Sequence, residues 1–286
     1  MQLAEKFLNG LKQPMIDNCM KVFENMQKMM NDQMTKAGDV VSQTPQAYNS
    51  DLYNLAKNIN ETAVIPIAVL IITFIAIYEI IHLVIDRNNF NDFETFIFFK
   101  WIFKTSISIY LVSHAFEFSM AIFDVMQSVI RSASGISIQQ FQVGQEAMKA
   151  SIEKMSIVDL MFFTTQLNAM QMIVWALGIV IWVICVGRII EMYFIISVGA
   201  LPFATLTSSR YGHIGDSYIK SAVALGLQGL FIIITLGAWS VFVQSLTVAK
   251  NGNPWTFMFS FLAASLLAVI VLFRTKSAAS SIVSAA

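Results

Sequence analysis

The sequence predicts an all-α, polytopic helical membrane protein with about five transmembrane spans, drawn from six hydrophobic segments, and an N-terminal amphipathic helix. Its 286 residues are 56% hydrophobic and only 13% charged, whereas a typical soluble domain has about 25% charged residues. Several apolar runs reach the roughly 20 residues that cross the hydrocarbon core of a bilayer. The net charge is zero, so bulk charge gives no reason to expect nucleic-acid binding.

The first 61 residues predict an amphipathic helix followed by a loop. Apolar side chains recur there at steps of three or four, which puts them on one helix face. This stripe consists of Leu8, Leu11, Met15, Cys19, Val22, Met26 and Met29. Pro14 is a point where the helix can bend, and "VVSQTPQAYNS" around Pro45 is typical of a loop. The stripe fits packing on its own chain, packing against a partner helix or second copy, or lying flat on a membrane.

Residues 62–124 are expected to form the first transmembrane pair. The first span runs from Thr62 to Ile85 and is followed by a short charged turn, "DRNNFNDFE". The second span, "FIFFKWIFKTSISIYLVSHAFEFSMAIF", is less apolar. Residues 125–159 then form a hydrophilic central segment, a Ser/Gly-rich loop followed by an amphipathic helix at "VGQEAMKASIEKM".

Polar side chains inside the first pair are candidate pathway or interface residues. They are Glu79, His82, Lys100, Lys104, His114 and Glu117. Lys100 and Lys104 are one turn apart, so they share a face and can reach the interface. Glu-x-x-His pairs build metal sites in helical bundles, but a di-metal centre needs further carboxylates, and only Glu191 lies at comparable depth. We therefore expect polar helix pairing, with no metal and no cofactor.

No catalytic signature stands out in the chain. A Walker loop, a Cys-x-x-Cys cluster and a nucleophile elbow are all missing from the sequence. The glycines of "RYGHIGDSY" predict a turn, because no Gly-Lys-Ser/Thr follows them to hold a phosphate. We expect a protein that is not an enzyme.

Residues 160–276 predict a C-terminal transmembrane block, and residues 277–286 a short tail. Two polar stretches divide the block, "TSSRYGHIGDSYIKS" and "NGNP", and both are typical of turns. Trp255 to Phe273 is the last predicted span. Within the block, Ala222, Gly226 and Gly229 allow close helix approach, and Gln228 can bond across helices.

Arg188 and Glu191 lie in the longest apolar region and leave two topologies open. Either they mark a tight turn, which gives six spans, or residues 165–206 form one long, broken element that crosses once, which gives five. The distribution of Lys and Arg does not decide. On one helix, Arg188 and Glu191 at i and i+3 can pair, which reduces the cost of at least about 3 kcal/mol for a charge at bilayer depth. Pro202, with Gly199, can interrupt the helix beyond.

The stretch "GRIIEMYFIISVGALPFATLTSSRYGHIGDSYIKSAVALGLQG", from Gly187 to Gly229, resembles the TrbL-like conjugal transfer proteins, in particular those of Gram-positive conjugative elements. These are polytopic subunits of type IV secretion systems in the bacterial cytoplasmic membrane. The order of an N-terminal helix, two spans, a hydrophilic segment and an apolar block is similar too. The short tail departs from relatives that carry a long one.

The resemblance implies five spans, an extracytoplasmic N-terminus and central segment, and a cytoplasmic C-terminus. It also implies a ring-like homo-oligomer that works beside other secretion-machine subunits in the lipid bilayer. Such a scaffold or channel subunit would support transfer of single-stranded DNA with attached protein, or assembly of surface filaments. An internally packed monomer explains the small residues almost as well. Alternative functions are a secondary transporter for a small solute and an immunity or pore-type protein of a mobile element.

Overall fold

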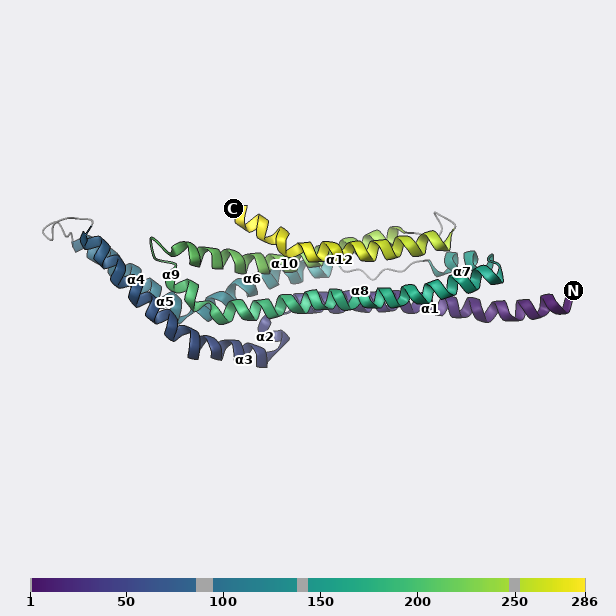
Figure 1. Cartoon of the computed structure of the whole chain (residues 1–286), viewed down its shortest axis with the longest axis horizontal. Coiled ribbons are helices and arrows are strands. Elements are labelled where there is room, and N and C mark those ends of the chain that lie inside the picture. Colours follow the sequence, from purple (N-terminus) through teal and green to yellow (C-terminus); the bar gives the residue numbers. More distant parts are fainter. Residues whose placement is uncertain (1, 86–94, 138–143, 247–252, 286) are drawn as a thin grey trace. The chain divides into compact units, whose positions relative to one another are not determined.

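The computed structural model describes residues 2–85, 95–137, 144–246 and 253–285, and every regular element in these ranges is a helix (Figure 1). The chain divides into two compact units. The first unit comprises Met1–Ser42, Ile130–Val186 and Leu230–Thr275, and the second comprises Gln43–Val129, Gly187–Gly229 and Lys276–Ala286.

Four helical segments in the described ranges are long and apolar enough to cross a membrane. They are Ser50–Ile85, Ile157–Val198, Gly212–Ser245 and Pro254–Ser284. A fifth crossing results if the bent pair Phe98–Ser113 and Ala115–Ser134 counts as one span. The predicted all-α, polytopic class with about five spans is confirmed.

Helix α1 (Gln2–Ser42) supplies the amphipathic N-terminal helix and continues through Pro14. Its Cys19, Val22 and Met26 are buried in the core of the first unit. That core also takes side chains from α7 (Gln145–Glu153), α8 (Ile157–Val198), α10 (Gly212–Ser245) and α12 (Pro254–Ala285). The stripe therefore packs on its own chain, the first of the three settings; the side chains of Leu8 and Leu11 lie outside the described set.

The predicted loop around Pro45 is wrong, because two short capped helices occupy most of it. Helix α1 runs to Ser42, and α2 (Pro45–Tyr48) starts directly after Thr44, whose hydroxyl accepts an N–H of its first turn. The Asn49 side chain accepts two main-chain N–H groups of α3 (Ser50–Ile59). Such caps satisfy donors that a helix start leaves free.

A π turn, η1 (Asn60–Val64), joins α3 to α4 (Ile65–Ile85), so the first span is part of a helix that begins at Ser50. The N–H of Ile65 donates to the carbonyl of Asn60, the five-residue step of a π turn. The fully buried Asn60 amide donates to the carbonyl of Ser197 at 2.9 Å. It thereby satisfies a carbonyl in the last turn of α8.

The second span is not a single straight helix. Helices α5 (Thr95–Ser113) and α6 (Ala115–Ser137) meet at His114 with a bend of 69°. Helix α6 runs to Ser137, so the first part of the predicted central loop is wrong, whereas the predicted amphipathic helix is present as α7. The predicted charged turn at 86–94 lies outside the described residues.

Helix α8 is continuous through Arg188 and Glu191, so the tight turn and the six-span topology are wrong. The interruption comes later, at Gly199, and the short α9 (Ala200–Thr205) that follows contains Pro202. In the second unit α9 packs against both α4 and α5 around Ala68, Val112 and Phe203.

Two further boundaries differ from the prediction. Helix α10 begins at Gly212, inside the stretch predicted as a polar turn, and leaves only 206–211 as connection. Helix α12 starts at Pro254 and continues to Ala285 through the predicted tail. The Asn253 side chain accepts the N–H of Trp255, so part of the predicted "NGNP" breaker is a cap.

Candidate functional site

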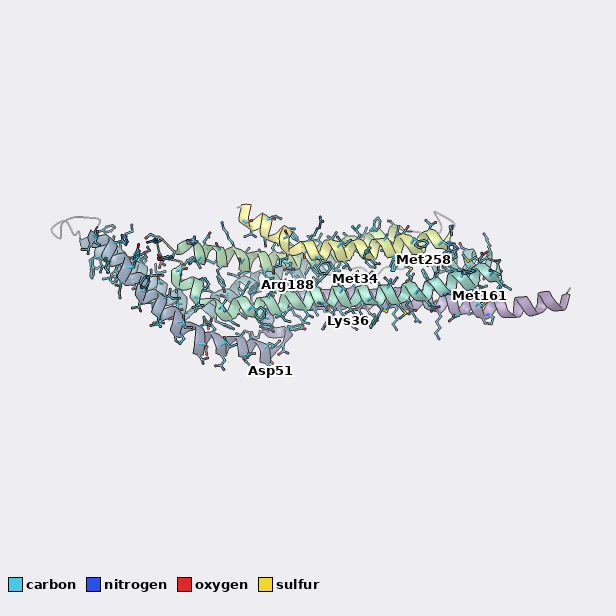
Figure 2. All side chains as sticks on the ribbon, viewed as in Figure 1. Met34, Lys36, Asp51, Met161, Arg188 and Met258 are labelled. Carbon is cyan, nitrogen blue, oxygen red and sulfur yellow. The ribbon has the colours of Figure 1, made fainter. Side chains whose placement is uncertain are left out.

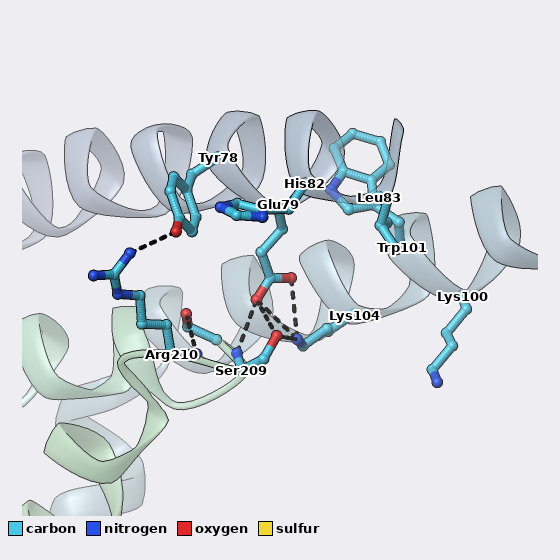
Figure 3. A pocket seen from close by; sticks show the side chains of 10 residues that line it. Tyr78, Glu79, His82, Leu83, Lys100, Trp101, Lys104, Ser209 and Arg210 are labelled. Atoms are coloured by element: carbon cyan, nitrogen blue, oxygen red, sulfur yellow. Dashed lines mark hydrogen bonds and ion pairs between the residues drawn. The ribbon is translucent and has the colours of Figure 1, made fainter. Parts of the chain in front are cut away.

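A polar cavity in the second unit brings together α4, α5 and the connection between α9 and α10. Its volume is about 480 Å³, and Figure 3 shows the side chains that line it. Four residues predicted separately from the sequence line it: Glu79, His82, Lys100 and Lys104. The cavity brings together polar groups from the end of α4, the start of α5 and the connection after α9. This connection lies much further along the chain than α4 and α5.

Glu79 is the central acceptor of this cavity. The ammonium of Lys104 lies 2.9 and 3.0 Å from its two carboxylate oxygens. The main-chain N–H of Ser209 donates to the carboxylate at 2.9 Å, and the Ser209 hydroxyl at 3.1 Å. The Glu79 side chain is only 14% exposed, so these donors replace water around a charge that would otherwise be costly there.

Arg210 lies at one end of the cavity and is held by aromatic groups. Its Nη1 donates to the Tyr78 hydroxyl at 2.6 Å. The guanidinium lies 5.8 Å from the centre of the Tyr78 ring and 5.7 Å from that of Tyr211, within the range of cation–π attraction. The hydrogen bond to Tyr78, with the nearby tyrosines, raises the pKa of Arg210 above its ordinary value.

Figure 3 shows Lys100 beyond Lys104, on the side of the cavity away from Arg210. Lys100 is exposed, and the His82 ring lies 4.4 Å from that of Tyr78. His114 and Glu117 are not part of this site: His114 marks the bend between α5 and α6, and Glu117 is exposed on α6.

Sequence reasoning did not single out Tyr78, Ser209 or Arg210. The polar stretch "TSSRYG" between apolar helices was the available signal.

Arg188 and Glu191 make contacts with different helices. The Arg188 side chain is 1% exposed (Figure 2), and it donates to the main-chain carbonyls of Leu225 at 3.1 Å and Gly226 at 3.3 Å in α10. Glu191 accepts from Lys276 of α12 at 2.7 Å. Main-chain acceptors thus stabilise the buried guanidinium. Direct pairing of Arg188 with Glu191 stays a prediction.

The small residues of α10 are used inside the chain. Ala222, Gly226, Gln228 and Gly229 are all buried. A methyl group at Gly226 would come within 2.5 Å of Met126 Cγ in α6. Close helix approach is therefore present, but between two helices of the same second unit, and an interface between copies has to use other surfaces.

Comparison with known families decides the class. The family model for TrbL/VirB6 plasmid conjugal transfer like proteins matches residues 30–200, from within α1 to the start of α9. This chain belongs to the TrbL/VirB6 family. It is a multi-pass membrane protein and a conjugal transfer subunit of the type IV secretion class, a structural component that associates with other subunits of the machinery.

The family match confirms the resemblance seen in the sequence, with different coverage. Of the stretch Gly187–Gly229, only 187–200 lies inside the match. Arg188 and Glu191 are included, while Pro202 and the small residues of α10 lie beyond it. No curated protein and no solved structure gives a match.

Proposed function

We propose that this TrbL/VirB6 protein assembles with copies of itself into a ring-like scaffold and channel subunit in the bacterial cytoplasmic membrane, and supports transfer of single-stranded DNA with attached protein. The observation that carries the proposal is that one face of α1 packs in the core with an uncharged apolar stretch of α8 while its other face is exposed and charged. The charged face requires water or protein as its neighbour.

Helix α1 exposes a line of charges opposite its buried stripe. Its members alternate in sign: Asp17, Lys21, Glu24, Lys28, Asp32, Lys36 and Asp39. Alternating charges along one face are typical of a helix surface in water. Lys36 is labelled in Figure 2.

The charged face lies at the level of the apolar stretch "IVWALGIVIWVICVG" of α8. Two contacts in the first unit fix this register. The Cys19 thiol lies beside the Thr164 side chain, and a methyl group at Gly178 would come within 2.9 Å of Gln33 Cγ. Because Asp32 and Lys36 flank Gln33, they lie beside the centre of this uncharged segment.

Lipid is a poor neighbour for this face. A charge at the bilayer centre costs at least about 3 kcal/mol, and α1 carries several within a few turns. On α8, in contrast, Trp182 is 45% and Val183 53% exposed, and both suit lipid or an apolar neighbour. In a ring with α1 turned toward a water-filled lumen, the charged face of α1 contacts water and the exposed apolar side chains of α8 contact lipid.

The cavity around Glu79 supports five crossings. It joins the end of α4 and the start of α5 to the connection after α9, so both connections belong on one side of the membrane. If α5 and α6 together cross once, this condition is met, whereas a re-entrant α5–α6 pair would separate them. Five crossings put Lys100, Lys104, Arg210 and Lys276 on one side of the membrane, while the distribution of Lys and Arg over the whole chain does not decide which side this is.

Cysteine accessibility in native membranes tests the position of α1. Native Cys19 and Cys185 are both fully buried, so the background is low. A water-soluble maleimide is expected to label Lys36→Cys and to leave the matched control Val183→Cys, at a similar level on α8, unlabelled. Equal labelling of the two variants would show that this part of α8 is not at bilayer depth.

Particle size tests assembly. After mild detergent extraction, light scattering behind size exclusion should give several protomers per particle. A monomer that retains α1 and still supports conjugal transfer would contradict the proposal. In a mating assay, Asp32→Leu with Lys36→Leu should lower DNA transfer at normal membrane levels, because the pair removes charge from the lumen face.

A further inference from the structure

We propose that the cavity around Glu79 binds the phosphate headgroup of an anionic glycerophospholipid, with its acyl chains along the outer faces of α4 and α5. This inference concerns the second unit alone. It does not depend on ring assembly or on DNA transfer, and its test separates it from both.

Among the described residues, the lining of the cavity carries an excess of positive charge. In these parts of the chain, three cations, Lys100, Lys104 and Arg210, line the cavity with one carboxylate, Glu79. That carboxylate is occupied by Lys104 and by the two donors of Ser209. A headgroup would therefore meet both Lys100 and Arg210 without displacing the pair of Glu79 and Lys104.

Arg210 is prepared for such an acceptor. A guanidinium has five N–H donors in a planar fork, and the bond to the Tyr78 hydroxyl uses one of them. That bond and the two tyrosine rings hold the group at the cavity edge. Arginine held in this way matches the geometry of phosphate oxygens.

The walls beside the cavity favour an amphiphile over a free anion. On α4, Ile81 is 49% and Ile85 63% exposed, and on α5 Phe99 is 63% and Phe103 69% exposed. Apolar surface of this kind continues outward from both helices that line the cavity. A soluble phosphate gains nothing from it, whereas acyl chains bury it.

The position and size of the cavity fit a headgroup. It lies at the end of the candidate span Ser50–Ile85, and tyrosine and tryptophan, here Tyr78 and Trp101, are enriched at the level of lipid headgroups. Basic pockets between transmembrane helices are known to bind anionic lipid headgroups. The volume of about 480 Å³ falls within the roughly 300–1,000 Å³ of ligand pockets.

Thermal unfolding of the full-length protein in neutral detergent tests the site. Phosphatidylglycerol is expected to raise the midpoint temperature, and phosphatidylcholine is not. The double variant Lys100→Gln and Arg210→Gln should need about thirtyfold more phosphatidylglycerol for half of the effect, at about fivefold per cation. The matched control, Lys28→Gln with Lys36→Gln, removes the same charge from exposed positions of α1 and should behave like wild type.

Four results would overturn the proposal. Equal weakening in the double variant and in the α1 control would mean general surface attraction. The same stabilisation by inorganic phosphate at equal concentration would identify a soluble-anion site, and by oligothymidine a nucleic-acid site. If the double variant is poorly folded, the single change Lys100→Gln decides, because Lys100 is exposed; an unchanged response to phosphatidylglycerol in that variant would reject the site.

Discussion

Replacing Gly199 by alanine is expected to destabilise the second unit. Gly199 separates α8 from α9, and a methyl group there would come within 2.5 Å of the Tyr218 hydroxyl and 2.7 Å of the Ser119 hydroxyl. These two hydroxyls hydrogen-bond to each other at 2.6 Å and tie α6 to α10. The methyl group therefore has to push apart a bonded pair.

The net cost works out at about 0.5–3.5 kcal/mol. Overpacking a well-packed site costs about 1–3 kcal/mol, and loss of the hydroxyl pair adds about 0.5–1.5 kcal/mol. Gly199 has helical dihedral angles, φ −55° and ψ −33°, so alanine returns about 1 kcal/mol through helix propensity. At about 2–4 °C per kcal/mol for a chain of this size class, the unfolding temperature should fall by about 1–14 °C.

Thermal unfolding in detergent, followed by size exclusion of the soluble fraction, measures this shift. Gly187→Ala is the matched control, because it lies on α8 with no heavy atom within 4 Å of the added methyl group. It should be neutral or gain up to about 1 kcal/mol. If both alanine variants unfold at the same temperature, the packing argument for Gly199 fails.

Three more perturbations test other contacts. Glu79→Gln and Lys104→Gln should each lower stability by about 1–3 kcal/mol, and the double variant by clearly less than the sum; additive losses in the same unfolding assay would deny the ion pair. Burial encloses the Cys19 thiol and raises its pKa to about 11, which keeps the reactive thiolate scarce, so at pH 8 maleimide should label the folded protein far more slowly than the denatured protein; equal labelling rates would contradict the burial. Tyr193→Phe removes a 2.6 Å bond to the Pro45 carbonyl and should cost about 1 kcal/mol, and an unchanged unfolding temperature would argue against that bond.

The sequence predicts elements best where one face is apolar over many turns. The steps between Cys19, Val22 and Met26 place α1 correctly because burial of a stripe is a periodic signal. The apolar run around Arg188 left a tight turn and one long element open, and α8 has the second form. In both cases the physical cause, burial of apolar surface, is local in the sequence.

Predictions fail where the same type of residue is common both in loops and at helix caps. Thr44 and Asn49 lie in the stretch predicted as a loop, and their side chains cap α2 and α3. The bend at His114 has no proline or glycine beside it, so hydropathy did not reveal it. In the candidate site, Glu79 and Lys104 are recognisable as charges in apolar segments. Ser209 and Arg210 are not, because polar residues are expected in a polar turn whether or not they bind a partner. Their pairing depends on contacts between distant segments.

The π turn at Asn60–Val64 has a consequence for chain length among relatives. A π turn holds one residue more than the α-helix around it, so a single-residue deletion there would restore a regular α-helical ladder and leave the rest of α4 in nearly the same orientation. Homologues one residue shorter at this point should therefore keep the span and present the same side of α4 to α5 and α9.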